Sequence, residues 1–232
     1  MDIVKHGNIV FIKEFFNKYR VFRDRIDAGR VLGRVCRDVI EDSVDFVYAI
    51  PRGGVPVGYE VAKALNSRLD LLICRKILIP WDREAGFGAV DPDGNIYVDY
   101  EYATYLNLSE DEIKGAIAEQ LNEIKMRNAI LRDGRGYPDL TGKSVILVDD
   151  GIAAGYTMSV AVRFVKGRNA SRVYIAVPTC HLNSIDKLSK EVDLAICLNI
   201  RSGYIYAVAD AYIKWRDLTD DDIMKYISGE LS

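Results

Sequence analysis

Two adjacent carboxylates stand out as residues whose type and spacing could do chemistry. Asp149 and Asp150 directly follow the apolar run 145–148, which is typical of a strand buried on both faces. Carboxylates at the end of such a strand can accept hydrogen bonds from hydroxyl groups or bind a divalent cation. The pair is therefore a candidate site for a hydroxyl-bearing ligand or for Mg²⁺.

The residues after the acidic pair favour a phosphate instead. This segment is rich in small residues and leads into an apolar-periodic helix; it contains Gly151, Ala153, Ala154, Gly155, Tyr156 and Thr157. Small side chains let a ligand approach the main chain, and free N–H groups at a helix start attract an anion. A ribose 5-phosphate unit would satisfy both halves, with its hydroxyls on the acids and its phosphate on the loop.

Two other interpretations of this stretch stay open. It could be an ordinary strand, turn and helix with solvated acids. It could also be an acidic metal pocket like that of receiver domains or dehalogenases, in which Asp149 would form an acyl-phosphate. The second interpretation leaves the run of small residues unexplained.

Two further segments place positive charge after predicted strands. Arg52, Gly53 and Gly54 follow the apolar strand 46–50, and Arg75 and Lys76 follow the predicted buried strand 69–74. Glycines permit a special backbone, arginine offers a planar fork for phosphate oxygens, and open α/β sheets bind ligands at this edge. A structural glycine turn and a solvated strand end are the alternatives.

The order of these motifs resembles that of the type I phosphoribosyltransferases. In that family, apolar residues precede two acids and a small-Thr-Gly-x-Thr loop, and a pyrophosphate loop and a basic residue come earlier. The Pro51–Gly54 loop and the segment 22–30 make the chain most similar to an uncharacterised group of phosphoribosyltransferase-like proteins.

The resemblance implies a role for each motif. Asp149, Asp150, Arg52 and Lys76 would be catalytic, and the two aspartates would also hold Mg²⁺, directly or indirectly. Substrate would be bound by residues of the loops, the lid and an aromatic segment: Gly53, Gly54, Arg75, Gly151, Ala153, Ala154, Gly155, Tyr156, Thr157, Glu84 and Tyr204.

Some of these residues also fit a purely structural role. Tyr204 and Asp210 lie in an aromatic segment that also fits plain packing. Arg25 fits a solvated helix start, for which Asp27 is the expected N-cap, as well as a place at the sugar-phosphate cleft. The role of Glu84, and the general acid or base, are not predicted by the sequence.

The implied reaction transfers the 5-phosphoribosyl group from phosphoribosyl pyrophosphate to a nitrogen acceptor such as a nucleobase, releasing pyrophosphate. Two positions depart from the family pattern: Ala154 removes a hydroxyl from the phosphate loop, and Ala153 removes a carboxylate that purine-salvage relatives use for the acceptor's proton. A non-catalytic regulatory protein that binds phosphoribosyl pyrophosphate or a nucleotide is therefore the alternative. The acceptor is not predicted by the sequence.

The elements needed to position these motifs fit one α/β domain over residues 1–232. Predicted strands alternate with helices, which favours a doubly wound, mainly parallel sheet of about five strands flanked by helices. We expect a flexible lid loop over about 77–96, a helical insertion over about 109–131 with a capping box at Ser109, a final helix capped by Thr219 with Asp222, and a small hood from the terminal segments.

Composition limits the partners. The net charge of −3 over 232 residues gives no footprint for nucleic acid. No apolar run reaches membrane-spanning length, the N-terminus has no signal-peptide core, and the four cysteines lack metal spacing. We expect a cytoplasmic protein with reduced cysteines that binds small molecules; a homodimer stays open.

Overall fold

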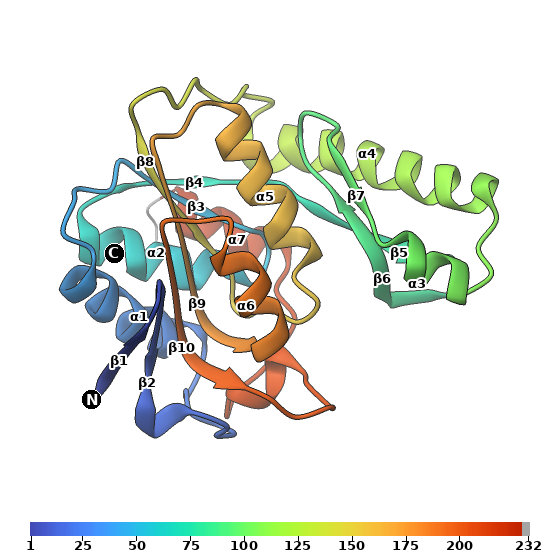
Figure 1. The fold of residues 1–232 in the computed structure, drawn as a ribbon. Coiled ribbons are helices and arrows are strands. Elements are labelled where there is room, and N and C mark those ends of the chain that lie inside the picture. Colours follow the sequence, from blue (N-terminus) through green and yellow to red (C-terminus); the bar gives the residue numbers. More distant parts are fainter. Residues whose placement is uncertain (229–232) are drawn as a thin grey trace.

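The computed structural model describes residues 1–228, apart from the side chains of residues 83 and 84. Strands and helices alternate along most of the chain (Figure 1). The strands are β1 (Ile3–His6), β2 (Ile9–Ile12), β3 (Phe46–Ala49), β4 (Arg68–Leu71), β5 (Arg75–Ile79), β6 (Asp82–Val90), β7 (Ile96–Val98), β8 (Ser144–Val148), β9 (Arg172–His181) and β10 (Leu194–Arg201). The helices are α1 (Arg25–Val39), α2 (Gly54–Leu65), α3 (Tyr100–Tyr105), α4 (Glu110–Arg132), α5 (Tyr156–Gly167), α6 (Leu182–Ser189) and α7 (Asp220–Ile227), with short 3₁₀ helices η1 (Lys13–Phe15) and η2 (Val208–Ala211).

A seven-stranded sheet forms the body, in the order β1-β2-β10-β9-β8-β3-β4. Every neighbouring pair runs parallel except β1 with β2, which is antiparallel. The predicted mainly parallel α/β fold is confirmed. The sheet exceeds the expected five strands because the N-terminal segment adds β1 and β2 along β10.

Strand β8 lies inside this sheet, and its side chains alternate between two helix layers. Val145 and Leu147 pack in one cluster with residues of α5 and α6, whereas Ile146 and Val148 pack in another with residues of α1 and α2. An unbroken apolar strand is stable only when both faces are covered. Figure 1 shows α5 and α6 in front of the sheet.

The expected lid loop is corrected by the structure. Most of residues 77–96 form β5, β6 and the start of β7, a separate three-stranded antiparallel sheet that projects with α3 and α4 to one side of the body (Figure 1). The glycines that suggested a loop serve close packing instead. A Cβ atom at Gly88 would lie 2.2 Å from the Tyr97 carbonyl oxygen.

The helices begin after the expected capping residues, except for α1. Ser109 and Glu112 form a reciprocal capping box at α4, and Thr219 does the same with Asp222 at α7. The N-cap of α1 is Asp24 rather than Asp27. Asp27 instead accepts a hydrogen bond from the Arg23 main-chain N–H at 2.9 Å.

The part of the chain covered by residues 1–228 contains no helix that is both long and apolar enough to cross a membrane. The four cysteines are free and buried, as expected for core residues.

Candidate functional site

A cavity of about 550 Å³ opens where β8 ends. Eight of the sequence-predicted site residues line it: Lys76, Asp149, Gly151, Ala153, Ala154, Gly155, Tyr156 and Thr157. Gly151 is constrained here, since a Cβ atom would lie 2.5 Å from a methyl group of Val208. The structure therefore brings the first acid, the small-residue loop and one basic residue around a single space.

The small-residue loop ends at an open helix terminus. Gly155 is the N-cap of α5 with φ of +87°, and no described side chain caps this helix, so its first N–H groups are available to an anion. Two contacts hold the loop to neighbouring elements. Ser184 Oγ of α6 donates a 2.5 Å hydrogen bond to the Ala153 carbonyl, and Ile152 forms an isolated β-bridge with Cys180 of β9. Rigid support for free N–H groups suits a phosphate.

Asp150 is arranged differently from Asp149. Its Oδ2 lies 2.8 Å from Arg25 Nε, and the two side chains are only 13% and 10% exposed. Asp150 is not among the residues lining the cavity. The two neighbouring acids therefore have different surroundings: one faces the cavity and the other is held in a buried ion pair.

Arg25 is fixed by the C-terminal part of the chain. Its Nη1 donates a 2.8 Å hydrogen bond to the Arg216 carbonyl, and its guanidinium lies 3.8 Å from the centre of the Trp215 ring. Tyr212 adds a 2.6 Å hydrogen bond from its hydroxyl to the Asp150 carbonyl. Segments near the two ends of the chain thus meet at Asp150.

Burial governs the protonation of both acids. It raises the pKa of Asp149 well above the usual range, and the negative charge of Asp150 adds to this rise. Burial also raises the pKa of Asp150, but the Arg25 guanidinium acts against it. The ion pair thus favours the charged form of Asp150.

The Arg52 loop packs directly on the acidic pair. A Cβ atom at Gly53 would lie 1.9 Å from Asp150 Oδ2, and one at Gly54 would lie 2.8 Å from Asp149 Cα. The Pro51–Arg52 peptide bond is cis. Both glycines are thus required by close approach, which places the loop beside the acids without placing it on the cavity lining.

Arg75 and Lys76 do not act as a pair. They start β5 rather than end the preceding strand, and consecutive strand residues point to opposite sides. Lys76 lines the cavity with Asp149, whereas Arg75 lines a separate one of about 480 Å³ against α4, with its Nε 3.3 Å from Gln120 Oε1.

Tyr156 makes a further contact besides lining the cavity, and two other predicted residues are not part of the lining. Tyr156 donates a 2.7 Å hydrogen bond to Asp99, which ties the start of α5 to the segment before α3. Tyr204 is fully exposed and is not part of the cavity lining. The side chain of Glu84 lies outside the described residues.

Several cavity residues were missed by sequence reasoning: Ala85, Gly86, Tyr102, Ile152, Met158 and Val208. Ile152 and Met158 belong to the Asp149 stretch itself but are apolar, and the other four come from segments that meet this loop only in the folded chain. Arg25 had a weak signal, a basic residue at a helix start, but its partner is 125 positions away.

How Mg²⁺ could be bound here depends on how many carboxylates face the cavity. Within residues 1–228 no group of three or more acid, histidine or cysteine side chains could hold a metal ion. Of the two predicted carboxylates whose side chains the structure describes, Asp149 faces the cavity and Asp150 does not. A single carboxylate suits Mg²⁺ bound mainly through substrate phosphates rather than in an all-protein cage.

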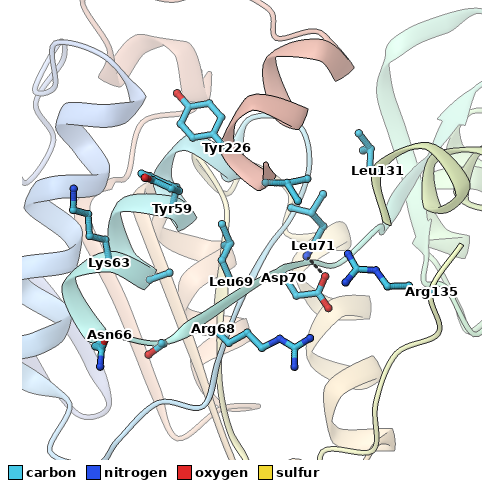
Figure 2. A pocket seen from close by; sticks show the side chains of 13 residues that line it. Tyr59, Lys63, Asn66, Arg68, Leu69, Asp70, Leu71, Leu131, Arg135 and Tyr226 are labelled. Carbon is cyan, nitrogen blue, oxygen red and sulfur yellow. Dashed lines mark hydrogen bonds between the residues drawn. The ribbon is translucent and has the colours of Figure 1, made fainter. Parts of the chain in front are cut away.

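A larger cavity, of about 810 Å³, lies at the far end of α2, between β4 and α7. Figure 2 shows Tyr59 and Tyr226 on one side of it and Arg68 and Asp70 on another. Its lining has no residue of the Asp149 motif, so size alone does not identify the site.

Comparison with known proteins bears on this geometry. Residues 96–210 match the model of the phosphoribosyl transferase domain, a range that includes the Asp149 motif but not the Arg52 loop. The chain is 32% identical over 208 residues to a protein found in two strains of Mycobacterium tuberculosis and provisionally named a phosphoribosyl transferase. That alignment takes in 90% of this chain and 46% of the relative, so the chain spans about half the length of the curated relatives it matches.

Among solved structures, the protein TT1426 from Thermus thermophilus superposes with a TM-score of 0.70 at 29% identity. The match covers 89% of this chain and 97% of that one.

Proposed function

This chain belongs to the phosphoribosyl transferase family, and on that premise we propose that it transfers the 5-phosphoribosyl group of phosphoribosyl pyrophosphate to a nitrogen acceptor. The observation that carries the proposal is the cavity in which Asp149 and the uncapped start of α5 face the same space. A carboxylate that can accept hydrogen bonds from sugar hydroxyls and a helix start that can hold a phosphate lie together there.

The two neighbouring aspartates have different roles in this proposal. Asp149 accepts hydrogen bonds from the ribose hydroxyls, and the main-chain N–H groups at Tyr156 and Thr157 hold the 5-phosphate. Asp150, bound to Arg25, supports the loop rather than facing the sugar. This modifies the assignment of both acids as ribose ligands.

The reaction breaks the bond between the sugar's anomeric carbon and pyrophosphate, which leaves with the electron pair. A nitrogen lone pair of the acceptor forms the new bond, and the acceptor loses its proton. Positive charge develops on the sugar, and the Asp149 carboxylate beside it stabilises that charge. Arg52 and Lys76 neutralise the leaving pyrophosphate.

Asp149 would hold Mg²⁺ together with oxygens of the donor, and the ion would supply charge neutralisation for the phosphates. Positioning of the sugar and exclusion of water remain the work of the protein side chains.

Binding and turnover test the proposal separately. Calorimetry with ribose 5-phosphate should show binding that Asp149→Asn abolishes. Release of pyrophosphate from phosphoribosyl pyrophosphate in the presence of a panel of nucleobases should show turnover. Absence of ribose 5-phosphate binding in the intact chain would overturn the assignment of the cavity.

A regulatory protein that binds the donor without turnover is the second candidate. Ala153 favours it, since this loop position has no carboxylate for the acceptor's proton. Such a protein would bind donor and ribose 5-phosphate normally but release no pyrophosphate with any acceptor.

A further inference from the structure

Two consecutive main-chain carbonyl groups of the small-residue loop are held by elements outside the cavity lining. The Ile152 carbonyl accepts a 2.9 Å hydrogen bond from the His181 main-chain N–H. The next carbonyl, of Ala153, accepts the 2.5 Å hydrogen bond from Ser184 Oγ of α6. Neither Ser184 nor His181 lines the cavity, whereas Ile152 and Ala153 both do. These two carbonyl oxygens are therefore bonded to neighbours outside the lining.

The bond from Ser184 fixes the direction of the peptide group between Ala153 and Ala154. In a planar trans peptide, the N–H group points away from the preceding carbonyl. Because the Ala153 carbonyl is directed at α6, the Ala154 N–H is directed away from α6. Ala154 itself lines the cavity, so its N–H lies on the side from which a ligand would approach.

The Ala154 N–H is available to such a ligand. None of the described residues accepts a hydrogen bond from it, and it precedes the uncapped first turn of α5. Successive main-chain N–H groups that point into one space form a concave site for an anion. A reversed peptide would present the Ala153 carbonyl oxygen there instead, and its partial negative charge would repel a phosphate.

The contact between the loop and α6 is close and nearly dry. The Ser184 side chain belongs to a residue that is only 7% exposed, so water competes little for its hydroxyl. A Cβ atom at Gly155 would lie 3.5 Å from Ser184 Cβ and 3.4 Å from a methyl group of Leu188. The loop thus packs on α6 at the point where the hydrogen bond is made.

We propose that Ser184 is a positioning residue for the 5-phosphate: by holding the Ala153 carbonyl on α6, it keeps the Ala154 N–H directed at the phosphate. The inference rests on the proposed function. It gives α6 an effect on donor binding without a contact to the donor. Loss of the Ser184 hydroxyl should therefore weaken binding of the phosphate and spare the hydrogen bonds between the sugar and Asp149.

The test is titration of the ¹⁵N-labelled full chain with ribose 5-phosphate and with ribose, followed by the amide resonances in NMR spectra. In the wild type, ribose 5-phosphate should shift the Ala154 resonance and ribose should not. Ser184→Ala should bind ribose 5-phosphate roughly tenfold more weakly, because a hydrogen bond to a charged group is weakened or lost. Its affinity for ribose should be unchanged, which general damage to the fold would not allow.

Ser189→Ala is a matched control from the same helix. Ser189 is 4% exposed, and its Oγ donates a 3.1 Å hydrogen bond to the Asp186 carbonyl. The two variants therefore remove similar buried hydroxyls and should lose similar amounts of stability in denaturant unfolding. Ser189→Ala should nevertheless bind both ligands like the wild type and show the wild-type shift of Ala154.

The outcomes separate this inference from the proposed function. If the wild type binds ribose 5-phosphate and Ser184→Ala binds it equally well, the role of Ser184 is wrong and the proposed function is untouched. The same conclusion follows if Ser184→Ala loses ribose to the same extent, or if Ser189→Ala loses ribose 5-phosphate as strongly. If the wild type does not bind ribose 5-phosphate, both are wrong.

Discussion

Arg25 Nε and Asp150 Oδ2 lie 2.8 Å apart in a pair that is almost entirely buried. This contact removes one of two consecutive acids from the cavity and leaves Asp149 facing it. It also joins the start of α1 to the end of β8 and, through Trp215, to the C-terminal segment.

Arg25→Met should lower the free energy of unfolding by about 3–5 kcal/mol, because it leaves the Asp150 charge buried without a partner. Denaturant unfolding measures the change. Lys143→Met, which breaks an exposed ion pair with Asp45, should cost no more than about 1 kcal/mol. Equal losses in the two variants would contradict the structural role of the buried pair.

Gly53→Ala should destabilise the protein by about 1–3 kcal/mol and weaken ribose 5-phosphate binding, because the new Cβ atom would displace Asp150. Gly115→Ala offers a matched control within α4, where no described atom lies within 4 Å of a Cβ. That variant should gain about 0.5–1 kcal/mol from its higher helix propensity. Unfolding and calorimetry of both proteins check the contrast.

Asp149→Asn should be more stable than the wild type at pH 7 while losing ribose 5-phosphate. The folded protein raises the pKa of Asp149, so ionisation at neutral pH opposes folding. This penalty is absent below the unfolded pKa of about 3.9 and grows as pH rises toward the higher folded value. Thermal unfolding should therefore show an advantage that shrinks from pH 7 toward about pH 4; an advantage independent of pH would refute this account.

Ala154→Thr should tighten ribose 5-phosphate binding by about tenfold, since it adds a hydroxyl donor to an exposed position of the phosphate loop. Ala154→Val has the same branched shape without the hydroxyl and should show no gain. Calorimetry on the two variants decides the matter. A gain in both, or in neither, would mean that the phosphate does not lie at this loop.

Local patterns in the sequence were sufficient for much of the fold. The apolar run that precedes Asp149 predicted a buried strand, and β8 is buried along its whole length. Ser109 and Thr219 predicted the starts of α4 and α7. These signals are reliable because burial periodicity and helix capping depend on residues only a few positions apart.

The same local reasoning was wrong for the segment 77–96. Its glycines indicated a loop, but Gly86 and Gly88 lie inside β6, where neighbouring strands leave no room for a side chain. Close approach between strands is a property of the packed structure, and glycine density alone cannot distinguish it from a turn.

By itself the sequence determined the order of the motifs, the family they resemble and the mainly parallel α/β architecture, because each follows from residues close together along the chain. Only the tertiary structure decided which acid faces the cavity and why Lys76 and Arg75 point to different cavities. The reason is physical: side-chain direction and ion pairing between distant segments depend on how the elements pack, and no local pattern records that packing.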